Sequence, residues 1–119
     1  MIHCQMMIAG NFSPCEKSYP EFKENLDYVI REWNQKNSKD IKWFKLKKIN
    51  SALCQSVAGV NYIFTLILGR TTCPKQQILA HPNQSSCKML LKTVRIKYRV
   101  NTNLKGKQIR SFLMNQCKQ

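Results

Sequence analysis

The sequence predicts an α+β domain, in which one helix near the N-terminus packs against an antiparallel sheet built from the rest of the chain. Apolar residues recur at helical spacing over residues 19–37, and three later stretches alternate in hydropathy as strands do. We find no repeat, linker or low-complexity tract, and 119 residues suffice for one compact domain. We therefore expect a single domain over residues 1–119.

The helix is expected to run from Tyr19 to about Asn37. Ser18 followed by Glu21 has the spacing of a capping box, and Pro20 is tolerated in the first turn. The polar stretch NSKD that follows is expected to end the helix. The apolar stripe of the helix comprises Phe22, Leu26, Val29, Ile30 and Trp33.

Strands are expected at residues 41–49, 60–72 and 90–100, with a last short strand within SFLMNQC. The alternation slips before Ile49, which indicates a bulge. The stretch 60–72 is apolar on both faces, as is typical of a central strand. The stretch 90–100 has one polar face, and its apolar face comprises Val94, Ile96, Tyr98 and Val100.

The composition is strongly basic, with 20 Lys and Arg against 6 Asp and Glu and a net charge of +14. Such a surface attracts polyanions, acidic proteins and anionic lipid. No zinc-finger spacing, phosphate-binding glycine loop or aromatic RNA motif accompanies the charge, so we expect no specific nucleic-acid ligand. The N-terminal MIHCQMMIAG lacks the basic start of a signal peptide, and no segment approaches transmembrane length.

Six cysteines in so short a chain indicate an oxidising compartment: Cys4, Cys15, Cys54, Cys73, Cys87 and Cys117. No Cys-X-X-Cys pair occurs and the chain has two histidines, so we expect no metal site. Nothing in the spacing brings a histidine to a nucleophile, and the acidic residues lie mostly on the exposed face of the helix. We therefore expect no enzyme and no cofactor.

The connection between the first two hydrophobic strands, QSVAG at residues 55–59, is unusual for a hairpin tip. Most such tips are polar turn formers, whereas this one presents Val57 and Ala58 between small residues. A narrow apolar tip suits insertion into a cleft. The alternative is a slightly hydrophobic loop without a role.

These residues carry a resemblance to a known family. QSVAG resembles the Gln-X-Val-X-Gly first binding loop of the cystatins, inhibitors of papain-like cysteine proteases, and GRTTCPK at residues 69–75 is similar to a stretch of secreted type 2 cystatins. The helix LDYVIREWN ends at Asn34 as the family's helix does, and Gly10 lies 24 residues before it. The resemblance covers about Ile8 to Cys117.

The resemblance implies a cystatin-like fold, with one helix wrapped by a four- to five-stranded antiparallel sheet. It also implies a secreted monomer, with the signal peptide outside this sequence, that reversibly and tightly inhibits papain-like proteases of the cathepsin type. In cystatins the N-terminal segment and two hairpin loops plug the protease cleft. By position, residues 1–9 are a flexible segment, Gly10 is its turning point, and the first loop is Gln55, Ser56, Val57, Ala58 and Gly59.

Three departures qualify the resemblance. Leu104 and Lys105 stand where the second loop has a Pro-Trp pair, and losing such an aromatic anchor costs about 2 kcal/mol or more. The resemblance implies a Cys73–Cys87 disulfide, but Ile96 replaces a cysteine of the other family bridge, which leaves the pairing of the remaining four cysteines open. Lys39 replaces the Asn of the family's legumain-binding Ser-Asn-Asp, so we expect no legumain inhibition.

A second hypothesis is a cystatin-fold protein that no longer inhibits and instead binds a polyanion, an anionic membrane or an acidic partner. A basic cluster would carry that function, although a solvated strand face explains it equally well. The intact first loop and the N-terminal glycine favour inhibition. The cluster comprises Arg95, Lys97, Arg99, Lys105, Lys107 and Arg110.

Overall fold

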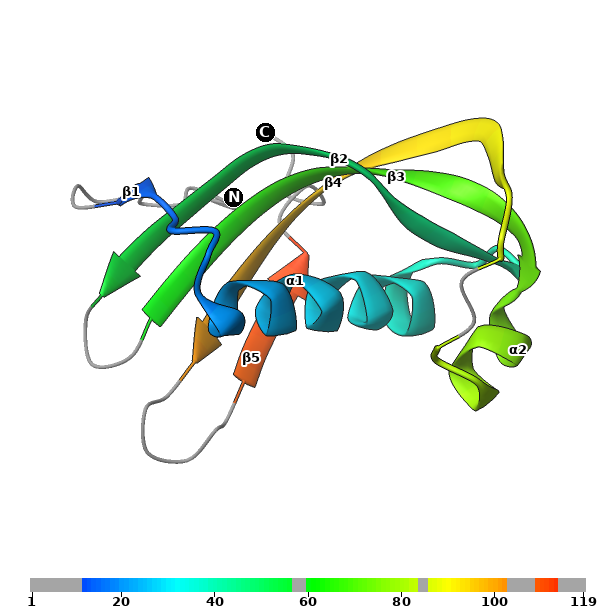
Figure 1. The fold of residues 1–119 in the computed structure, drawn as a ribbon, viewed down its shortest axis with the longest axis horizontal. Coiled ribbons are helices and arrows are strands. Elements are labelled where there is room, and N and C mark those ends of the chain that lie inside the picture. Colours follow the sequence, from blue (N-terminus) through cyan, green and yellow to red (C-terminus); the bar gives the residue numbers. More distant parts are fainter. Residues whose placement is uncertain (1–11, 57–59, 84–85, 103–108, 114–119) are drawn as a thin grey trace, which may run out of the picture.

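The computed structural model describes residues 12–56, 60–83, 86–102 and 109–113. A five-stranded antiparallel sheet, in the order β1-β2-β3-β4-β5, curves around helix α1 (Figure 1). The prediction of one helix wrapped by a four- to five-stranded sheet is confirmed. The elements are β1 (Ser13–Pro14), α1 (Pro20–Glu32), η1 (Trp33–Asn37), β2 (Lys42–Ser56), β3 (Val60–Pro74), α2 (Lys75–Ala80), β4 (Met89–Thr102) and β5 (Ile109–Leu113).

Helix α1 and the π-helical turn η1 together cover the predicted helical stretch as far as Asn37. The predicted capping box is wrong, because the N-cap is Tyr19 and no side chain caps the helix. Pro20 explains this start: its ring forces the preceding residue into an extended conformation, and its missing N–H removes one donor that a cap would satisfy. Among the residues that the structure describes, no helix is long and apolar enough to cross a membrane.

Strand β3 lies at the centre of the sheet, as its apolar faces predict. Its pairing with β2 shifts register between Leu46 and Lys48 and again between Ile49 and Ser51, so the predicted irregularity in this strand is confirmed. These bulges let the long β2 follow the curvature around the helix. Strand β4 buries alternate residues, with Ile96, Tyr98 and Val100 at most 1% exposed.

The main core lies between α1 and the concave face of the sheet (Figure 1). Phe22 of α1 meets Phe64 of β3 edge to face, with ring centroids 5.6 Å apart. Ile96 is 1% exposed and pairs in register with Leu66, so hydrophobic packing fills this part of the core.

Asn34 in η1 joins the helix to the sheet through a fully buried amide. Its Nδ2 donates to the backbone oxygens of Ile30 and Phe44, each at 2.9 Å, and its Oδ1 accepts the Phe44 N–H at 2.8 Å. Beside it, the Trp33 and Phe44 rings meet edge to face at 5.2 Å. The amide thus satisfies the buried backbone N–H and C=O of Phe44, a β2 residue whose register partner in the sheet is Arg70 of β3.

A second, smaller core lies under α2, which the sequence did not reveal. It comprises Cys73, Cys87 and Ile78, with Trp43 of β2 packed against it. Cys73 and Cys87 form a disulfide, the pairing that the family resemblance implied. With a sequence separation of 14 between the two cysteines, the bridge stabilises the fold by about 3 kcal/mol in the chain-entropy model.

We predict that Asn34→Ala lowers the free energy of unfolding by about 4 kcal/mol, because it leaves the buried N–H and C=O of Phe44 without partners. Asn25→Ala is the matched control. Asn25 is also buried, but its side chain bonds to the Glu21 carbonyl of its own helix and to the Tyr62 side chain, and not to the backbone of β2, so we expect a smaller loss of about 1–2 kcal/mol. Urea unfolding measures both, and equal losses would contradict this role for Asn34.

Candidate functional site

The ends of two hairpins lie side by side at one end of the sheet (Figure 1). Ser56 pairs with Val60, Val60 with Thr102, and Thr102 with Ile109, so the four strand ends stand in one row. The Thr102 hydroxyl also donates to the Val60 carbonyl at 3.1 Å. Both hairpin connections, residues 57–59 and 103–108, therefore start from the same end of the sheet, which we name the hairpin edge.

The N-terminal strand β1 adds a third segment beside this edge. Ser13 pairs with Cys54 and Pro14 with Leu53, close to where β2 ends. A Cys15–Cys54 disulfide, with the two Cα atoms 4.9 Å apart, fastens the strand there. Five strands at the usual spacing of about 4.8 Å make the hairpin edge roughly 19 Å wide.

Two of the predicted protease-binding residues lie within the described chain. Gln55 stands opposite Asn61, and its Oε1 accepts a hydrogen bond from Asn61 Nδ2 at 3.0 Å, which holds the base of the first loop. Ser56 is the last residue of β2. The other predicted site residues lie outside the described residues: Gly10, Val57, Ala58, Gly59, Leu104 and Lys105.

The Cys15–Cys54 pairing was not foreseen from the sequence, where four cysteines had no assigned partner. Strand β1 is only two residues long and has no alternation to detect, so nothing indicated that Cys15 lies beside β2. Pairing Cys54 removes the possibility of a free thiol next to the first loop. The residues described include no group of three or more His, Cys, Asp or Glu able to hold a metal ion.

The sequence of this chain matches a known protein family over most of its length. The family profile described as "Cystatin domain" matches residues 10–103, which is more than three quarters of the chain. The protein belongs to the cystatin family. The match includes Gly10, Asn34 and the QSVAG loop, and it ends one residue before Leu104.

Curated cystatins resemble parts of this chain. Macaque (Macaca mulatta) cystatin-C is 42% identical over 62 residues, which cover 52% of this chain and 39% of that protein. Human cystatin-SA is 33% identical over 81 residues, which cover 68% of this chain and 54% of that protein. The chain thus matches about two fifths to just over half of the length of these relatives.

Solved structures support the cystatin fold over a larger share of the chain. The crystal structure of Al-CPI aligns with a TM-score of 0.70 and 21% identity, covering 92% of this chain and 98% of that one. Dimeric human cystatin F aligns with a TM-score of 0.62 and 21% identity, covering 93% and 97%. At this level of identity the likeness concerns the fold.

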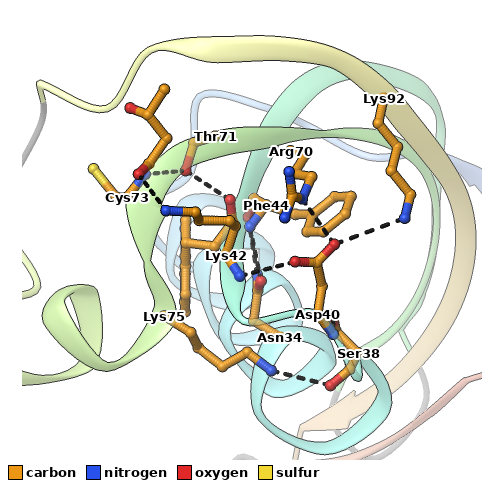
Figure 2. Close-up of polar contacts among 12 residues, drawn as sticks. Asn34, Ser38, Asp40, Lys42, Phe44, Arg70, Thr71, Cys73, Lys75 and Lys92 are labelled. Atoms are coloured by element: carbon orange, nitrogen blue, oxygen red, sulfur yellow. Dashed lines mark hydrogen bonds and ion pairs between the residues drawn. The ribbon is translucent and has the colours of Figure 1, made fainter.

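The loop after the helix of this cystatin, Ser38 to Asp40, is tied into the fold by polar contacts (Figure 2). Asp40 Oδ2 accepts a hydrogen bond from Arg70 Nε at 2.8 Å, and Asp40 Oδ1 accepts one from the backbone N–H of Lys42 at 2.9 Å. The Ser38 carbonyl accepts one from Lys75 Nζ at 3.0 Å. These groups are used in holding β2, β3 and α2 together.

Two hydrogen bonds lower the pKa of Asp40 from 3.8 to about 2: the larger effect comes from the Arg70 side chain, and the next from the backbone N–H of Lys42. Lys92 Nζ adds a weaker attraction from 3.7 Å. The pKa of Asp40 is lower in the folded protein than in the unfolded chain. The contacts of its carboxylate therefore stabilise the fold above about pH 4, and this stabilisation is lost as the pH falls toward 2.

An open cavity of about 580 Å³ lies between α1, β2 and α2, away from the hairpin edge. Its walls mix apolar and charged side chains, among them Tyr28, Arg31, Trp43 and Ile78. It contains none of the residues predicted to bind a protease. The hairpin edge, where the family motif and the strand register coincide, is therefore the candidate site.

We predict that replacing Cys15 and Cys54 together by Ser lowers the free energy of unfolding by about 4 kcal/mol, since the bridge closes a loop with a sequence separation of 39. The matched control replaces Cys73 and Cys87, whose separation is 14, and should cost about 3 kcal/mol. Chemical denaturation under non-reducing conditions measures both. A non-reduced peptide map that lacked a Cys15–Cys54 cross-linked fragment would contradict the pairing.

We predict that Asp40→Asn destabilises this cystatin by about 1–2 kcal/mol at pH 7 and by almost nothing at pH 2, where the native carboxyl is itself becoming protonated. Urea unfolding at the two pH values measures the difference. Asp27→Asn is the control, because Asp27 forms an exposed helical ion pair with Lys23 and should change stability by less than about 0.5 kcal/mol. An Asp40 effect that does not depend on pH would contradict the assignment.

Proposed function

We propose that this protein is a reversible, tight-binding inhibitor of papain-like cysteine proteases, and that the hairpin edge is the surface that enters the protease cleft. The observation that carries the proposal is the register that places the ends of β2, β3, β4 and β5 in one row, with β1 beside them. The family motif QSVAG occupies the first connection in that row.

The shape of this edge suits a cleft. A single sheet seen end on is narrow across its thickness and roughly 19 Å long across its strands. The base of the first loop is held by strand pairing and by the Gln55–Asn61 hydrogen bond, so little conformational freedom is lost on binding. The Cys15–Cys54 bridge fixes the third segment in the same way.

Inhibition would follow from blockade. The hairpin edge would present the three-residue connection 57–59 and its neighbours to the protease. It would cover the cleft without laying an extended peptide bond across the catalytic centre. Val57, Ala58 and Gly59 have small side chains that let the two backbones approach closely. Affinity would come from apolar burial and main-chain contacts on a surface that is largely formed beforehand.

The second hairpin connection would contribute less. Leu104 and Lys105 supply an aliphatic and a cationic group where an aromatic anchor would otherwise bind. Loss of such an anchor weakens binding by roughly thirtyfold or more. We therefore propose that the N-terminal segment and the first loop dominate, which would narrow the range of proteases that the protein binds tightly.

The protein would act outside the cell, as a monomer. Two disulfides in the described chain are suited to an oxidising compartment. The likeness to cystatin-C and cystatin-SA supports the same location. A cystatin-fold protein that no longer inhibits is the less favoured alternative, because the QSVAG loop at residues 55–59 would not be needed in a protein that binds no protease.

We predict that the oxidised protein inhibits papain or a cathepsin, and that Gly59→Glu weakens inhibition by at least tenfold by placing a charged side chain where backbones should meet. His81→Glu is the matched control, because the exposed His81 lies beyond α2 at the other end of β3. It should inhibit like the parent. Titration of active enzyme measures all three, and no inhibition by the parent at micromolar concentration would contradict the proposal.

A further inference from the structure

The chain contains two triplets of the form Asn-X-Ser, which is the acceptor sequence for N-linked glycosylation when X is not Pro. One begins at Asn11 and the other at Asn83, and none of the remaining eight Asn residues has Ser or Thr two positions later. Such triplets are modified in surface loops of secreted proteins. The structure around each triplet therefore decides its use, and the inference rests on the extracellular location proposed above.

Asn83 lies on the surface, in the turn that follows helix α2. The helix ends at Ala80, and residues 81–83 are all exposed. The buried residue of this helix is Ile78, which packs in the smaller core. Asn83 belongs to neither core cluster, so a large group attached to its side chain displaces no packed residue.

The side-chain amide of Asn83 is also available for modification. Among the described residues, no hydrogen bond holds this amide, whereas the amides of Asn25, Asn34 and Asn61 each donate at least one. Asn25 and Asn34 are moreover buried. The acceptor triplet at residues 83–85 thus begins at an Asn that the fold leaves free, and not at one that the fold uses.

Helix α2 and the hairpin edge lie at opposite ends of the molecule (Figure 1). Strand β3 joins the two regions, because it starts at Val60 in the hairpin edge and ends at Pro74, directly before α2. Its 15 residues extend over roughly 45 Å along the strand. Asn83 lines the cavity beside α2, which contains none of the residues predicted to bind a protease. A glycan on Asn83 would therefore start far from the hairpin edge.

The other triplet, Asn11-Phe12-Ser13, is placed differently. Asn11 itself lies outside the described residues, but Ser13 belongs to β1 and pairs with Cys54, close to where β2 reaches the hairpin edge. A glycan on Asn11 would start within about 7 Å of Ser13, the span of two residues. Use of this triplet would therefore oppose the proposed inhibition, whereas use of Asn83 would not.

We propose that Asn83, rather than Asn11, carries an N-linked oligosaccharide. In the reaction, Nδ2 of Asn83 forms a bond to C1 of the first sugar of a polyprenyl-diphosphate-linked oligosaccharide. The bond between this C1 and the diphosphate oxygen breaks, the lipid diphosphate leaves, and the amide loses one proton. The acceptor atom belongs to the described residue Asn83, and Gln84 and Ser85 contribute the sequence that the transferase recognises.

The modified protein would have one shielded end and one open end. An N-linked glycan is bulky and solubilising, so it would hinder protein contacts around α2. The hairpin edge would remain accessible, because the length of β3 separates it from α2. The glycan would therefore leave the proposed inhibition of proteases intact.

The first test maps the glycan on the full chain, secreted from mammalian cells behind an added signal peptide. Peptide-N-glycosidase in heavy-oxygen water converts a glycosylated Asn into an isotope-labelled Asp, which peptide mass spectrometry locates. We expect the label at residue 83 in most molecules and at residue 11 in few or none. An unlabelled residue 83, or a label at residue 11 as strong as that at residue 83, would overturn the proposal.

Two variants at one position form a matched pair. Ser85→Thr keeps the acceptor triplet, and Ser85→Ala removes it, while both retain Asn83 itself. We expect the intact Thr variant to have the mass of the glycosylated parent and the Ala variant to be lighter by one glycan. Equal glycan content in the two secreted variants would contradict the assignment to Asn83.

The second test titrates papain with the secreted parent before and after enzymatic removal of the glycan. We expect the two inhibition constants to agree within about twofold. A larger gain of inhibition on removal would overturn the placement of the glycan away from the hairpin edge. The two proposals fail separately, because an inhibitor without a glycan at Asn83 overturns this inference alone, whereas a glycosylated protein that does not inhibit overturns the proposed function alone.

Discussion

The buried amide of Asn34 is the contact on which the rest of this structure depends. It bonds to both backbone groups of Phe44 and so fixes where the helix ends against β2. Once β2 is held there, the ladder of backbone hydrogen bonds sets β3 and β4 in register around the helix. The position of both hairpin ends is a consequence of that alignment, even though they lie far from Asn34.

The two disulfides within the described residues lie at opposite ends of this arrangement. Cys15–Cys54 fastens β1 beside the hairpin edge, and Cys73–Cys87 closes the segment that contains α2. Cys73 and Cys87 belong to the smaller cluster under α2, whereas Cys15 belongs to the main core and holds the two-residue strand β1 against β2. The Asp40–Arg70 ion pair adds a polar connection between the post-helical loop and β3. Disulfides, an ion pair and buried side chains such as Ile96 thus stabilise this small domain together.

The charges of this chain are distributed unevenly between its helix and its sheet. All six Asp and Glu lie within residues 1–40, so the strands β2 to β5 contain Lys and Arg but no carboxylate side chain. The attraction of such a sheet for an anion is long-ranged and falls with ionic strength. Contact at the proposed hairpin edge would depend instead on shape, because the first connection has the small residues Val57, Ala58 and Gly59.

The sequence by itself determined the extent of the helix, the central position of β3, the alternation of β4 and the family motif, because each depends on residues a few positions apart. It predicted the wrong helix cap, since Pro20 sets the start of the helix, and it did not reveal α2, whose six residues are too few for a periodic pattern. Only the tertiary structure decided that Cys15 pairs with Cys54, that Asn34 bonds to Phe44, and that β1 joins the hairpin edge. The physical reason is that these contacts join residues ten to forty-one positions apart, and strand register rather than local preference brings them together.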